Sequence, residues 1–73
     1  MMLDETPLEA AERHVRDCEA FVARQKEIVA QQQRDGHVTQ DAETLLVAYE
    51  VMLEAHREVL ERAKAEFASR QHS

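Results

Sequence analysis

The chain has 73 residues, of which 33% are charged and 44% are hydrophobic, and its net charge is −6. This length allows a single domain, and the composition is typical of neither a disordered chain nor a membrane protein. Because an acidic protein is repelled by nucleic acid and by anionic membrane surfaces, the charge disfavours both as partners.

A first helix is expected over about 7–34. Thr6 is suited to cap its N-terminus, Pro7 fits the first helical position, and Glu9 is placed to complete a capping box. Residues 1–5 should fray ahead of this cap. Within the helix, Glu9 and Arg13 are spaced for an ion pair one turn apart.

Apolar side chains recur every three or four residues along this first helix, which predicts one buried stripe about 160° wide. Gln25 and Gln32 interrupt the stripe. Polar residues at such positions set the register or oligomeric state of a bundle, or they face a wetter end of it. Both interpretations stay open at this point.

The turn is expected over 35–39, centred on Gly36, the only glycine of the chain. Glycine adopts the left-handed conformation that commonly ends a helix. Val38 is then expected to pack back across the turn. Thr39 is the expected cap of the next helix, with Asp41 favourably placed near its positive end or acting as the cap itself.

A second helix is expected over about 40–68, with fraying from Ser69 onward. Its first half is apolar around more than half of its circumference, which is typical of a helix with several neighbours. Val47 and Val51 lie opposite its main stripe and form a candidate second contact surface. An acidic edge beside them is either solvated or recognises a basic partner; its residues are Asp41, Glu43, Glu50 and Glu54.

Two long helices around one turn predict an all-α fold, a two-helix antiparallel hairpin. A lone hairpin has little core, and the only cysteine, Cys18, cannot form an intrachain disulfide. Self-association into a homodimeric four-helix bundle is therefore expected. The predicted oligomer interface comprises Val15, Cys18, Phe21, Val22, Ile28, Val29, Leu45, Tyr49, Met52, Leu53, Val59 and Leu60.

An alternative hypothesis is a small metal-binding or metal-sensing protein. His14 and Cys18 are four residues apart on one helix face, and folding at Gly36 brings His56 near both. The competing interpretation is ordinary packing, since free cysteine is among the most buried residue types. A third hypothesis, nucleic-acid binding by the first helix, would use Arg16, Arg24, Lys26 and Arg34.

The sequence contains no recognisable catalytic constellation and no Gly-rich phosphate loop, so neither an enzyme nor a cofactor is expected. The start of the chain lacks the pattern of a secretory signal. Together with a single free cysteine, this favours the cytoplasm.

Several short motifs together resemble a group of short bacterial proteins that are predicted helical hairpins with no assigned activity. This resemblance implies a free-standing small bacterial protein, and it implies no functional residue. The motifs are Glu12-Arg13-His14-Val15, Val22-Ala23-Arg24-Gln25, Arg34-Asp35-Gly36-His37 with Thr39, Glu43, Leu45-Leu46 and His56-Arg57.

The function expected from the sequence is a non-enzymatic oligomeric interaction or adaptor module with a regulatory role. Its expected partner is a second copy of itself, and a further protein partner stays open.

Overall fold

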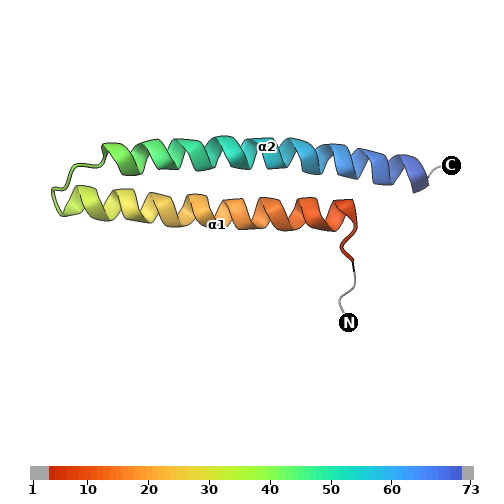
Figure 1. Ribbon diagram of the computed structural model, residues 1–73, viewed down its shortest axis with the longest axis horizontal. Coiled ribbons are helices and arrows are strands. Elements are labelled where there is room, and N and C mark those ends of the chain that lie inside the picture. The colour runs from red at the N-terminus through yellow and green to blue at the C-terminus, as the bar shows by residue number, and fades with distance from the viewer. Residues whose placement is uncertain (1–3, 72–73) are drawn as a thin grey trace.

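The computed structural model describes residues 4–71 and shows two antiparallel helices that pack against each other (Figure 1). α1 spans Pro7–Arg34 and α2 spans Gln40–Gln71. The all-α hairpin predicted for one chain is confirmed. The expected end of α2 near residue 68 is wrong, because strong helix formers such as Ala68 continue the helix to Gln71 and no glycine or proline interrupts it.

The predicted capping box at the start of α1 is confirmed. The Glu9 amide donates to Thr6 Oγ1 at 3.1 Å, and the Thr6 amide donates to Glu9 Oε1 at 2.9 Å. Since the Glu9 carboxylate is held there, Arg13 pairs with Glu5 at 2.9 Å and Asp17 at 3.7 Å instead of with Glu9. Glu5 is thus engaged rather than frayed. Residues 1–3 lie outside the described part of the chain.

The turn after α1 has the hydrogen bonds of a Schellman motif. Gly36 has a φ of 74°, its amide donates to the Gln33 carbonyl at 3.2 Å, and the His37 amide donates to the Gln32 carbonyl at 2.9 Å. Val38 does not pack back across the turn as expected but is 87% exposed. The last turn of α1 carries Gln and Arg side chains and offers it no apolar surface.

Thr39 precedes α2, and its side chain does not accept from a first-turn amide. Its hydroxyl donates to the Glu43 carboxylate at 2.5 Å, and its carbonyl accepts from the Glu43 amide at 2.8 Å. Asp41 and Glu43 place negative charge in the first turn of α2, where the helix dipole favours it.

The core is one seam between the helices, centred on Leu53. This side chain is 7% exposed and packs with Val15, Cys18 and Val22. Partly buried Leu46, Tyr49 and Leu60 extend the cluster along α2. Buried residues of α1 repeat with a spacing of seven, as in an antiparallel coiled coil; they are Ala11, Val15, Cys18, Val22, Gln25 and Val29.

The hairpin is a single layer of helices, 14 Å thick along its shortest axis, measured between Cα atoms. Its accessible surface is 5903 Å² for a mass of 8.4 kDa, whereas a compact monomer of that mass would expose about 4,600 Å². α2 also continues beyond the start of α1 (Figure 1), and Phe67 is half-exposed although it lines a hollow with Pro7 and Leu8. One chain alone therefore leaves much apolar surface in water.

Replacing Leu53 by Ala should lower the free energy of unfolding by about 2–5 kcal/mol, because it opens a cavity in the buried cluster that joins the two helices. We expect the variant to lose any assembly or to unfold, as measured by thermal melting and light scattering. Val51→Ala, on the exposed side of the same helix, should change stability by less than about 0.5 kcal/mol. A Leu53→Ala protein that keeps both its melting temperature and its molar mass would contradict this assignment of the core.

Candidate interaction surface

The two sides of the seam differ in chemistry, and one of them is polar. Across it, the Arg57 guanidinium lies 3.5 Å from the Glu19 carboxylate, linking α2 to α1. Lys26 and Glu50 line the same shallow hollow as this ion pair. We call these four residues the polar side. Because Glu19 and Arg57 are both half-exposed, their ion pair adds little stability, but it keeps this side of the seam wet.

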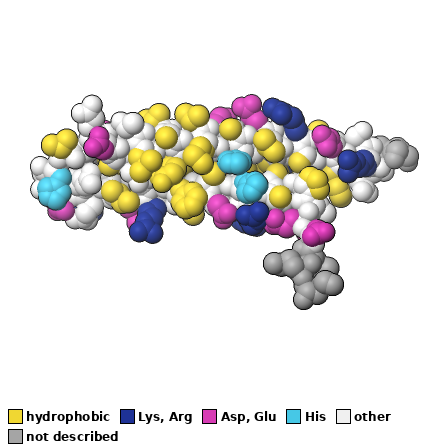
Figure 2. All heavy atoms as spheres, viewed as in Figure 1, with side chains coloured by type: hydrophobic (Ala, Val, Ile, Leu, Met, Phe, Trp, Pro, Cys, Tyr) yellow, Lys and Arg dark blue, Asp and Glu magenta, His cyan; other side chains and the backbone are white. Residues whose placement is uncertain are grey.

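The opposite side of the seam is apolar, and we call it the apolar side. It consists of Phe21 and Ile28 from α1 and Leu45, Met52 and Val59 from α2. Within each helix these residues are spaced by seven, so they form one column beside the seam. All five side chains are more than a third exposed, with Phe21 at 51% and Met52 at 45%. Figure 2 shows hydrophobic side chains gathered along the middle of this face.

Aromatic packing joins the apolar side to the seam. The rings of Phe21 and Tyr49 stack across the two helices, with centroids 5.7 Å apart and an angle of 24° between their planes. Tyr49 is half-buried against the Leu53 cluster, while Phe21 stands outside it. The exposed face is therefore continuous with the buried core.

The structure divides the predicted interface residues into two groups. Those on the apolar side remain free to meet a second molecule, whereas the buried ones already pack within their own chain, and Tyr49 and Leu60 lie half-buried between the groups. Sequence periodicity could not separate the groups, because both fall within one broad apolar stripe. The residues buried within the chain are Val15, Cys18, Val22, Val29 and Leu53.

The candidate metal ligands lie beside one end of the apolar side. The imidazole centroids of His14 and His56 are 5.2 Å apart, from α1 and α2 respectively, and both side chains are half-buried. Cys18 is a free thiol buried in the seam, where it packs with Leu53. Within residues 4–71, no cluster of three His, Cys, Asp or Glu side chains is placed to hold a metal ion. The structure thus brings the two histidines together, in contact across the helices.

The two glutamines of the α1 stripe behave differently. Gln25 is buried and its Nε2 donates to the Ala42 carbonyl at 2.9 Å, which ties the turn-proximal ends of both helices in one register. The Oε1 of Gln32 is buried without a hydrogen-bond partner within the described chain. The hydrogen bond of Gln25 accords with a register-setting role.

The outer face of α2 carries the candidate second contact surface. Val47 and Val51 are both well exposed. Of the acidic residues near them, Glu43 is engaged by Thr39 and Glu54 lies 3.9 Å from Arg57. Within the predicted acidic edge, Glu54 thus has a cationic neighbour, whereas Glu43 is hydrogen-bonded and keeps its charge.

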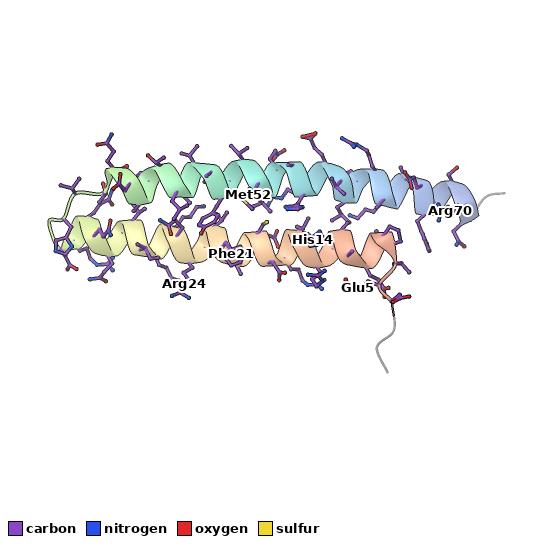
Figure 3. All side chains as sticks on the ribbon, in the orientation of Figure 1. Glu5, His14, Phe21, Arg24, Met52 and Arg70 are labelled. Carbon is purple, nitrogen blue, oxygen red and sulfur yellow. The ribbon has the colours of Figure 1, made fainter. Side chains whose placement is uncertain are left out.

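The basic residues of α1 do not all gather into one patch, although Arg24 and Arg34 line one shallow hollow together with Glu27. Lys26 lies on the polar side with two acids, and Arg34 donates to Gln31 Oε1 at 2.7 Å. Arg24 projects from the edge of α1 away from α2 (Figure 3). This scattering offers no continuous track for a phosphate backbone.

Four charged residues flank the apolar side. Sequence reasoning named Arg24 and Asp41 for other roles and did not recognise the four as one group. Asp17 and Arg24 precede Phe21 and Ile28 by four residues, and Asp41 precedes Leu45 by four. Arg62 continues the same seven-residue column on α2. We call these residues the rim. The signal that could have found them is this fixed spacing from the apolar side.

Comparison with protein-family models, with curated proteins and with solved structures finds no match for this chain. Neither helix of the described chain has an apolar stretch of the length that a bilayer span requires.

The hydrogen bond from Arg13 lowers the pKa of Glu5 below its ordinary value. A carboxylate with a depressed pKa stabilises the fold above its unfolded-state pKa, and that stability is lost as the pH falls through the folded-state pKa. We expect an NMR titration of the Glu5 carboxyl to show this depression, and Arg13→Gln to remove most of it, since Arg13 supplies its largest cause. Arg24→Gln, the same change of charge at a residue that does not act on Glu5, is the matched control. An ordinary Glu5 pKa in the unaltered protein would contradict the contact.

Proposed function

We propose that the protein is a non-enzymatic oligomeric interaction or adaptor module with a regulatory role in the cytoplasm. Its working unit is a homodimeric four-helix bundle in which two hairpins pack through their apolar sides. The observation that carries the proposal is an exposed apolar column beside the seam on each helix. Each helix thus has apolar residues in the seam and in a neighbouring column. This is the pattern of helices that face the core of a helix bundle.

The exposed area supports this proposal. The chain exposes 5903 Å², about 1,300 Å² more than a compact monomer of its mass. A standard interface buries about 800 Å² from each partner. A second copy that covers the apolar side would remove more hydrocarbon from water than one that covers another face. The apolar side gathers Phe21, Met52 and three aliphatic side chains.

A dimer of this kind keeps a second surface available. Val47 and Val51 lie on the outer face of α2, away from the apolar side, and stay exposed when the apolar sides are covered. We propose that this outer face contacts a further protein. An adaptor needs such a division, with one surface for assembly and another for its target.

Phe21→Glu or Met52→Glu should convert the dimer to monomer, because each places a charge in the centre of the proposed interface and leaves the buried residues around Leu53 unchanged. Light scattering across a dilution series measures the molar mass. Val51→Glu is the matched control, since it makes the same kind of change on the outer face of α2 and should leave the mass unchanged. A wild-type protein that is monomeric and melts cooperatively at micromolar concentration would contradict the proposal.

A second candidate function, metal binding or sensing, is favoured by the contact between His14 and His56. Two imidazoles from neighbouring helices are ordinary ligands for Zn²⁺, and Cys18 lies one turn from His14. A complete ligand set would need a rearrangement of Cys18 or ligands from a second copy.

If the protein binds Zn²⁺ through these histidines, one equivalent should raise the melting temperature, because a ligand that binds only the folded state stabilises it. His56→Ala should abolish the rise, while His37→Ala in the turn should retain it. Elemental analysis of protein purified without an affinity tag completes the test. No stoichiometric metal together with an unchanged melting temperature removes this candidate.

A further inference from the structure

We propose that the two hairpins pair with their turns at opposite ends of the bundle. This inference deepens the proposed dimer and rests on it. It is carried by the arrangement of charge on the rim, which flanks the apolar side and so borders any copy that covers it. The occupant to which the inference commits is a second copy of this chain.

Within the described hairpin the rim charges make few contacts: Asp41 faces the favourable helix dipole of the first turn of α2, but it has no cationic partner there. Arg24, Asp41 and Arg62 make no ion pair within the described chain, and Asp17 makes only a 3.7 Å contact with Arg13. All four side chains are exposed. On each helix the rim contains one acid and one base.

These charges are arranged symmetrically about one level of the hairpin. Asp17 and Arg24 lie on either side of Phe21, with their midpoint between Ala20 and Phe21. Asp41 and Arg62 have their midpoint between Val51 and Met52. Phe21 and Met52 stand at nearly the same level along the hairpin (Figure 3). Both charge pairs are therefore centred on one axis through the middle of the apolar side.

A two-fold axis through that level, running across the helices, places the turns at opposite ends. It sets α1 against α1 and α2 against α2 of the second copy. Asp17 of each copy then meets Arg24 of the other, and Asp41 meets Arg62. Such an interface is isologous, since each contact occurs twice. The surface of one hairpin is thus complementary to itself in this orientation.

The uncharged residues fit the same axis. Ala48 and Ala55 lie between Asp41 and Arg62 in the same seven-residue column of α2. Their midpoint also falls between Val51 and Met52. Two small side chains there let the α2 helices approach closely. On the apolar side, Leu45 of one copy meets Val59 of the other.

The alternative places both turns at the same end and sets α1 against α2 of the second copy. In that orientation, residues at the same height along the seam face each other across the interface, so Asp17 lies opposite Ala55 and Arg24 lies opposite Ala48. The rim charges have no partners of opposite sign in that orientation. Charge complementarity therefore selects the orientation with opposite turns.

A nitroxide label on Cys at position 38, introduced as Val38→Cys with Cys18→Ala, tests the orientation by dipolar EPR. The stretch from Phe21 to Val38 is about 25 Å long at 1.5 Å per residue, so opposite turns place the labels about 50 Å apart. Turns at the same end place them about 20 Å apart, since packed helices lie only 8–10 Å from axis to axis. The label is far from the proposed interface, at an exposed side chain.

A distance near the longer value supports the inference. A dimer by light scattering with the shorter distance overturns the orientation and leaves the proposed function standing. A labelled protein that is monomeric, like the unlabelled protein, overturns both. The two failures are therefore distinguishable in one set of samples.

Charge reversal provides an independent test. An acidic-rim variant carries Arg24→Asp and Arg62→Asp, and a basic-rim variant carries Asp17→Arg and Asp41→Arg. Each alone should dimerise at least about tenfold more weakly, while their mixture should form a one-to-one heterodimer, because like charges meet in the first case and opposite charges in the second. Arg16→Asp is the control away from the rim. Rim variants that each keep the wild-type dissociation constant would overturn the orientation.

Discussion

Two helices in a single layer can enclose only one line of side chains, and here that line is the seam around Leu53. From α1, the side chains of Val15, Cys18 and Val22 pack against Leu53. No third element of the described chain covers either side of this seam. The stability of the hairpin depends on this seam. Its associations depend on the chemistry of the flanks, because each flank must face either water or another molecule.

The two flanks oppose each other in character, and this difference decides which side a partner can cover. Covering the polar side would remove water from the charges of Glu19 and Arg57. The attraction between the two charges offsets little of that desolvation cost. Covering the apolar side removes water from Phe21 and Met52 at no such cost. The ion pair on the polar side thus contributes more to the choice of surface than to the stability of the fold.

Local signals in the sequence were sufficient to predict the helices, but not the rotation of each helix about its axis. Thr6, Pro7 and Glu9 mark the start of α1, and Gly36 marks its end, because each acts on its own backbone neighbourhood. Cys18 and Phe21 both lie in the predicted stripe, yet one is buried and the other exposed. That distinction depends on which residues of α2 stand opposite, a tertiary property that a periodic pattern does not contain.

In the proposed dimer, the direction of pairing would also determine the form of the outer surface. With the turns at opposite ends, α2 would lie beside α2 of the second copy, so that the outer faces carrying Val47 and Val51 would stand on the same side of the bundle. They would then form one doubled patch. With the turns at the same end, α2 lies beside α1, and the two patches face opposite sides of the bundle. A partner of the doubled patch would contact both copies at once, so its binding would be coupled to dimerisation by mass action. The charges of the rim would in this way determine whether the two outer surfaces stand side by side.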